Sequence, residues 1–244
     1  MFPQAHVYFA GVVLDKMNDA VALGSIFPDM AIGAGVKRDV SHNSGMEMLD
    51  FLIQDGDLRD FALANITHGV TPGGLDYYGD EKNPPYEKGY CFEKGRALVE
   101  GTIRACNIPP EMGWWKAHNI VEMGIEMQVS SSGEYGKYLY SAFQNRELIA
   151  VISDRLGEFY HVGSLPFARR MSSFPSYIDL SAPTAESLAQ KYDFQMQYKH
   201  SISINIKEVA KLITLASEMV KEDMDDFFLS VTGRVKKIIV DINP

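Results

Sequence analysis

The sequence has few cysteines and no long apolar segment. Cys91 and Cys106 are its two cysteines, and both fall in one expected helix, where a rise of about 1.5 Å per residue separates them by roughly 22 Å. That separation excludes a disulfide between them, so we expect both to be small buried apolar side chains. No run reaches the roughly 18 apolar residues of a membrane-spanning helix, so we expect no membrane span.

The N-terminal segment lacks the basic residues, apolar stretch and small-residue cleavage site of a signal peptide. A cytoplasmic location is therefore the expectation. Basic residues are also outnumbered, because the chain has 23 Lys and Arg but 32 Asp and Glu, which gives a formal net charge of −9. This balance does not favour long nucleic acids as partners. If the substrate is anionic, bound metal ions are the simplest source of local positive charge.

Strand-like alternation is scarce as well, whereas apolar residues recur at helical spacing through most of the chain. With 46% hydrophobic and 23% charged residues, the composition is that of a globular protein. We therefore predict an all-α multi-helix bundle in which residues 1–244 form one domain. The expected helices are 4–19, 43–54, 57–70, 86–106, 110–130, 134–160, 184–197 and 204–232.

Several segments lack that periodicity. Residues 71–85 are rich in Gly and Pro and predict a long loop. Residues 167–183 are read as a linker before a C-terminal helical pair, with Ser181 or Thr184 capping the next helix. The apolar segment 24–29 is read as a loop that ends at Asp29. Residues 234–240 fit either a short strand or a last helical turn.

Four of the six histidines lie in the first half of the chain: His6, His42, His68 and His118. His6 shares a helical stripe with apolar residues and so points inward. A single buried histidine is most simply explained by a hydrogen bond to a carbonyl group. Several of them near carboxylates favour a metal site instead.

The segment 114–126 carries the strongest local pattern. His118 and Glu122 lie one helical turn apart at the same apolar face, so both side chains can converge on one point. A carboxylate at a buried face has to be paired or bind a metal, since an uncompensated buried charge costs several kcal/mol. The alternative is a surface hydrogen bond between them. Glu126, further round the helix, is expected to be solvated.

The remaining candidates admit simple alternatives too. Asp29 follows Pro28 and could cap a turn. His42 lies at a helix start and could be exposed there. His68 ends an apolar helix just before the Gly-rich loop.

The order of these motifs resembles the zinc-dependent phospholipase C family, whose superfamily includes the S1/P1-type nucleases. The resemblance covers residues 1–130 and rests on the ordered set His6, Gly-Ser-Ile-Phe-Pro-Asp29, His42, Thr-His68 and His118-x-x-x-Glu122. It implies an all-helical phosphoester hydrolase with up to three metal ions. Asp29, His42 and His68 would match the ligands of one zinc, His118 and Glu122 those of a second, and His6 with the chain's amino terminus those of a third. Asp29 would also match the family's base.

The chain departs from the family pattern in the loop. Where the family has an aspartate four residues after the histidine matched by His68, this chain has Pro72, and a further family histidine is missing. Asp76, with Asp80 as second choice, could replace the aspartate, or could be a turn residue. The amino terminus is a third departure, because secreted family members expose a new terminal residue after processing and no signal for that is expected here. Two metal ions are thus better supported than three.

The sequence predicts a metal-dependent hydrolase acting on a small phosphoester or a phospholipid head group. Zinc suits the mixed imidazole and carboxylate ligands, and iron, manganese, nickel or cobalt would also be accepted. The alternative is a non-catalytic helical protein with closed structural metal sites, which would lack the open coordination position of catalytic zinc. Association into a homo-oligomer through the C-terminal helices stays open.

Overall fold

The computed structural model describes residues 1–242, apart from the side chain at position 57. In that part of the chain there are fourteen α-helices and no strand, so the all-α prediction is confirmed. The longer helices are α1 (Pro3–Leu14), α2 (Asp19–Gly33), α5 (Asp57–His68), α8 (Pro110–Val129), α9 (Glu134–Gln144), α10 (Arg146–Phe159), α12 (Ala185–His200), α13 (Ile206–Val220) and α14 (Met224–Ile242). The shorter ones are α3 (Arg38–Ser41), α4 (Gly45–Leu52), α6 (Tyr90–Gly95), α7 (Val99–Cys106) and α11 (Leu165–Ser173), with a π-helical turn, η1 (Tyr77–Glu81), and two 3₁₀ turns, η2 (Arg96–Leu98) and η3 (Phe174–Ser176).

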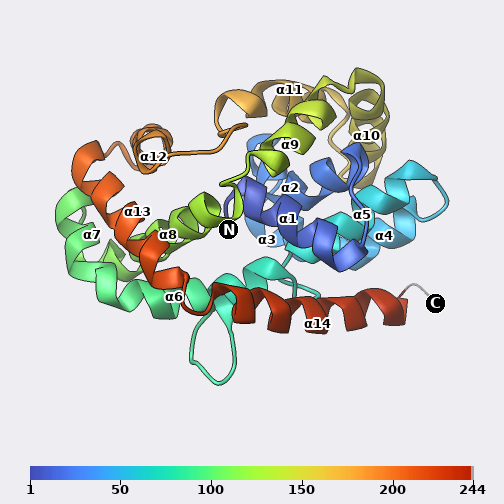
Figure 1. The fold of residues 1–244 in the computed structure, drawn as a ribbon. Helices are drawn as coiled ribbons and strands as arrows, with labels where there is room; N and C mark the ends of the chain where they lie inside the picture. Colours follow the sequence, from blue (N-terminus) through green and yellow to red (C-terminus); the bar gives the residue numbers. More distant parts are fainter. Residues whose placement is uncertain (243–244) are drawn as a thin grey trace.

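The helices form two groups that meet where α1 packs on α8 (Figure 1). In one group α1 and α2 pack on each other and on α5 and α9, with α4 on α5 and α11 on α2. In the other group α6, α7 and α13 pack on α8, and α12 lies on α13. The N-terminus lies between α8 and α1, and α14 runs along the lower edge in the view of Figure 1. The first turn of α1 is therefore placed at the junction of the two groups.

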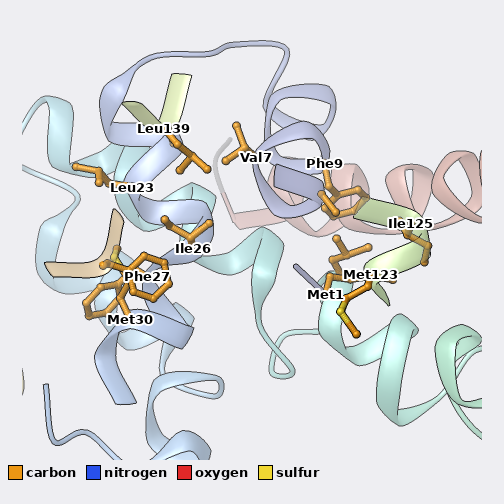
Figure 2. Close-up of a cluster of buried hydrophobic side chains, with 14 of the residues drawn as sticks. Met1, Val7, Phe9, Leu23, Ile26, Phe27, Met30, Met123, Ile125 and Leu139 are labelled. Carbon is orange, nitrogen blue, oxygen red and sulfur yellow. The ribbon is translucent and has the colours of Figure 1, made fainter. Parts of the chain in front are cut away.

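Helix α2 is central to the first group. Residues 20–28 are all buried, and Figure 2 shows Leu23, Ile26 and Phe27 of this helix within the apolar core. The helix passes very close to α5, because a Cβ atom at Gly24 would overlap the backbone of Phe61. This close approach holds together the two helices that carry Asp29 and His68.

The predicted loop at 24–29 is wrong, since these residues lie inside α2. The side chain of Asn18 caps the helix by accepting a hydrogen bond from Val21 N at 2.8 Å. The helix then continues through Pro28, which lacks the N–H group of a regular helical turn. Burial of the surrounding side chains against α5 and α11 offsets that lost hydrogen bond.

Other boundaries differ where a polar residue interrupts a continuous apolar pattern. The expected helix 4–19 is divided at Asp15, which has a left-handed φ of 49°. The expected helix 134–160 is divided at Asn145, whose side chain caps α10 by accepting from Leu148 N at 3.1 Å. The expected helix 204–232 is likewise divided at 221–223. Helical periodicity runs across such breaks, so the sequence pattern does not reveal them.

The irregular segments are more ordered than their composition suggests. Helix α11 occupies part of the expected linker 167–183, and α14 takes in the tail 234–240, whose structure the sequence left open. Of the two proposed caps, Thr184 caps α12 in a capping box with Ser187. Cys91 and Cys106 are both free and buried, as expected. None of the helices within residues 1–242 is long and apolar enough to cross a membrane.

The close approach of α2 and α5 can be tested with Gly24→Ala. The added methyl group would meet the backbone of Phe61 and force the helices apart, so we expect a loss of about 1–3 kcal/mol in the free energy of unfolding. Gly233→Ala on α14 is the matched control, because a Cβ there meets open space, and it should be neutral or slightly stabilising. Urea unfolding of both variants measures the difference, and equal stabilities would contradict the close packing.

Candidate metal centre

The N-terminus is anchored between the two groups of helices. The Met1 side chain is buried in the same apolar cluster as Phe9 and Met123 (Figure 2). Its amino group lies 2.9 Å from Asp76 Oδ1 and 2.9 Å from Glu122 Oε1. Burial opposes charge on this amine, but the nearby carboxylates, Asp76 foremost, raise its pKa well above the usual value. The chain therefore places an ammonium group among buried carboxylates.

A buried carboxylate on α8 fixes the first turn of α1. Glu126 accepts hydrogen bonds from Gln4 N at 3.0 Å and Ala5 N at 2.9 Å. These N–H groups belong to the first turn of a helix, which has no internal partners for them. Glu126 is 2% exposed, so the prediction that it is solvated is wrong. The sequence reasoning missed its role because its partner comes from a helix far away in the chain.

Asp76 lies at the centre of three histidines. Its Oδ1 atom is 3.3 Å from His6 Nε2, and its Oδ2 atom is 3.3 Å from His68 Nε2 and 3.4 Å from His42 Nε2. The rings of His6 and His68 stack with centroids 3.6 Å apart. Asp76 reaches this position because the Gly-rich loop turns back on α5: Gly74 N donates to Gly69 O at 3.0 Å, and a Cβ at Gly74 would overlap the carbonyls of α5.

Asp29 lies at the open edge of the cluster. Its Oδ1 atom is 3.6 Å from His42 Nε2, and its side chain is 42% exposed, against 1% for His42. The loop after α5 holds the backbone of His42, whose carbonyl accepts from Val70 N at 2.7 Å. His42 is thus buried, although the sequence left an exposed position open. Asp29, His42 and His68 form one group whose ligand atoms all lie within 4.8 Å of one another.

A second group with the same spacing comprises Asp80, His118 and Glu122. Asp80 Oδ1 is buried without a hydrogen-bond partner among the described residues. The amide of Asn119 donates to His118 Nε2 at 3.0 Å and to Glu122 Oε2 at 3.2 Å, while Phe92 stacks on the His118 ring. The sequence reasoning ranked Asp80 below Asp76, but the loop brings both into the cluster.

The hydrogen bonds of two rings set their tautomers. His68 Nδ1 is 2.7 Å from Ser25 O and His42 Nδ1 is 3.1 Å from Arg38 O. A carbonyl oxygen can only accept, so Nδ1 of His68 carries hydrogen. Nδ1 of His42 does so too, because the Ser41 hydroxyl 3.0 Å away gives its own hydrogen to Arg38 O. In the neutral ring Nε2 is then an acceptor, yet both Nε2 atoms face carboxylate oxygens and have no donor in the described residues. Two acceptor atoms that face each other need a cation between them, either a proton or a metal ion. Histidines that bind metals usually donate their other ring N–H to a carbonyl group in this way.

The pKa shifts agree with a cation-binding cluster. Burial lowers the pKa of His6 to about 4, with His68 and the ammonium group adding to the effect, and burial likewise lowers the pKa of His118 to about 4. These two rings are therefore neutral at pH 7, as metal ligands must be. Burial opposes charge on His42, but Asp29 and Asp76 raise its pKa to about 9. Despite burial, the ammonium group and His68 keep the pKa of Asp76 well below its usual value.

The structure brings together all the side chains singled out from the sequence: His6, Asp29, His42, His68, Asp76, His118 and Glu122. Their action as metal ligands stays a prediction. The chemistry of the donor set fits divalent metal ions, because Nε2 of His42 and Nε2 of His68 face carboxylate oxygens with no donor between them. His161 and His200 lie outside the cluster, His161 exposed and His200 Nε2 2.9 Å from Lys116 Nζ. Comparison of the chain with protein-family models, curated proteins and solved structures gives no match.

Burial raises the pKa of Glu126 to about 7, although its two backbone hydrogen bonds act in the opposite direction. The folded protein then binds this proton more tightly than the unfolded chain does. The contribution of Glu126 to stability is full below its ordinary pKa of about 4.3 and is lost as the pH rises through about 7. We expect the stability of the wild type relative to Glu126→Gln to fall by about 3 kcal/mol between pH 4.5 and 8.

Urea unfolding of the chelated proteins at several pH values measures this difference. Glu186→Gln, at an exposed position on α12, is the control for the loss of one negative charge. A stability difference between wild type and Glu126→Gln that is constant with pH would contradict the proton-binding role of Glu126.

Proposed function

We propose that this protein is a metal-dependent phosphoester hydrolase of the zinc-dependent phospholipase C type. The observation that carries the proposal is the convergence of four histidines and four carboxylates on one partly open cluster. No other described part of the chain groups three such side chains closely enough to share an ion. The resemblance in motif order and the all-α fold both support this reading.

Two ion positions are supported best. Asp29, His42 and His68 would hold one ion, and Asp80, His118 and Glu122 the other. Asp80 would stand in for the histidine that the family has at this point, and Asp76 for the missing aspartate. The two oxygens of Asp76 face different partners, Oδ1 toward His6 and Oδ2 toward His42 and His68, which suits a bridging carboxylate. His6, His68 and Asp76 also form a group with suitable spacing, and the Met1 amine could join them around a third ion.

Bound divalent ions would supply positive charge for the phosphoryl oxygens and make an attacking water more acidic. The chain's own residues would position the attacking water and take up its proton. Asp29 would serve as ligand and, as in the family, as base, because it is the partly exposed carboxylate of the first group. Burial disfavours its charge, but hydrogen bonding to His42 and the charge of His68 hold the pKa of Asp29 far below its usual value. It is therefore ionised, as a metal ligand must be, and its low pKa makes it a weak base that could act only on a water already made acidic by bound ions.

Zinc fits the imidazole-rich first group, while the second group offers two carboxylates to one imidazole. Such an oxygen-rich set would also accept manganese, iron, cobalt or nickel. We propose a small phosphoester or a phospholipid head group as substrate, since the acidic chain does not favour long nucleic acids. The second candidate function is a non-catalytic protein with structural metals. The exposure of Asp29 favours catalysis, because a structural site is closed on all sides.

The metal assignment is tested by elemental analysis of protein purified without a histidine tag. We expect two or more ions per chain in the wild type, and the loss of about one ion in both His118→Ala and Asp80→Asn, because each variant removes a donor of the second group. His161→Ala is the matched control, since His161 is exposed and lies outside the cluster. Unchanged metal content in both site variants would exclude the assignment.

Catalysis is tested with a chromogenic phosphodiester and a chromogenic phosphomonoester. We expect hydrolysis that stops on chelation and returns on adding zinc or manganese, and at least about a tenfold loss in both site variants. Full metal content without any hydrolysis would favour the structural-metal alternative.

A further inference from the structure

The metal cluster is open to solvent at Asp29. The side chain of Asp29 is 42% exposed, whereas those of Asp76 and Glu122 are 5% and 6% exposed. A substrate would therefore approach past Asp29, on the face of α2 that carries it. The residues around that face decide which charges the substrate meets first.

Arg170 of α11 lies on this face. Helix α11 packs against α2, and a Cβ atom at Gly33 would overlap the guanidinium atoms of Arg170, so the guanidinium covers Gly33 directly. Gly33 is four residues after Asp29 in the same helix, and residues at this spacing share a face with Cβ positions about 5–6 Å apart. Arg170 is thus about one helical turn from the exposed carboxylate of the cluster.

The guanidinium of Arg170 is held in place but has no acceptor. Its plane lies over the rings of Phe174 and Tyr177, with centroid distances of 4.7 Å and 5.0 Å. Its Nε atom is buried without a hydrogen-bond partner, and no carboxylate of the described residues lies within 4.0 Å of it. Arg155, by contrast, pairs with Asp55 at 2.8 Å. A donor group without an acceptor is unfavourable, so a ligand oxygen that reached the guanidinium would be bound favourably.

The charge environment is consistent with an anion site. Burial lowers the pKa of Arg170, while Tyr177 and Asp29 act in the opposite direction, so the charge of Asp29 reaches the guanidinium. Arginine stays charged under all ordinary conditions and offers a planar fork of N–H donors that matches phosphate oxygens.

We propose that Arg170 binds the non-bridging oxygens of the substrate's phosphoryl group at the entrance to the metal cluster, and that it favours a dianionic phosphomonoester over a monoanionic diester. This inference rests on the proposed function and makes Arg170 a specificity-determining residue. A fixed positive charge beside the cluster strengthens binding of the extra negative charge of a monoester. Hydrogen bonds to charged oxygens add to this attraction.

The test uses the metal-loaded full chain and two probes, inorganic phosphate and phenylphosphonate, whose binding is measured by calorimetry. Arg170→Gln should weaken binding of both probes about tenfold, and Arg170→Lys should restore part of it, because charge returns without the planar fork. Arg169→Gln is the matched control, since Arg169 is the exposed neighbour, and its affinities should equal those of the wild type. Gly33→Ala displaces the guanidinium without removing its charge, and should also weaken binding, which covers the case in which Arg170→Gln fails to fold.

Metal content separates this proposal from the proposed function. All four variants should retain the wild-type metal content, and the ratio of monoester to diester kcat/KM should fall in Arg170→Gln. A metal-loaded Arg170→Gln protein that binds both probes as tightly as the wild type would overturn the role of Arg170 alone. A wild-type protein that holds no metal, or binds neither probe, would overturn both proposals.

Discussion

The buried carboxylate of Asp76 is the group on which the candidate site depends. It lies within 3.4 Å of His6, His42 and His68 and 2.9 Å from the Met1 amine. A carboxylate removed from water is costly unless opposite charge surrounds it. Here that charge comes from chain segments far apart in sequence, so the cluster forms only when both groups of helices are assembled. The same constraint makes it a candidate cation site, because several carboxylates are crowded together away from water.

Helix packing and hydrogen bonds outside the cluster fix the positions of its side chains. Gly24 lets α2 approach α5 closely, which fixes the distance between Asp29 and His68. Glu126 ties the first turn of α1 to α8 and so sets His6 relative to Glu122. Carbonyl partners orient two of the rings and Asn119 orients a third, so the donor atoms are preorganised by hydrogen bonds outside the cluster. Because the side chains are already held in place, binding an ion would cost little further conformational entropy.

The cluster is also asymmetric. Its first group, with two imidazoles and the exposed Asp29, faces the side from which a substrate can enter, and Arg170 lies on that side. Its second group is richer in carboxylates, and His118 and Glu122 of that group are buried. The overall charge of −9 makes a local cation at the entrance important for any anionic substrate. Arg170 and bound metal ions would together create a positive region on an acidic protein.

The sequence by itself determined the all-α class and the four candidate histidines, because helical periodicity and the position of a residue on a helix face are local properties. His118 and Glu122 were found in this way, since both lie on one turn of α8. Only the tertiary structure decided that the loop carboxylates Asp76 and Asp80 join the cluster and that Glu126 is buried. A loop has no periodicity that tells which way its side chains point, and the burial of a charged residue depends on partners more than a hundred positions away.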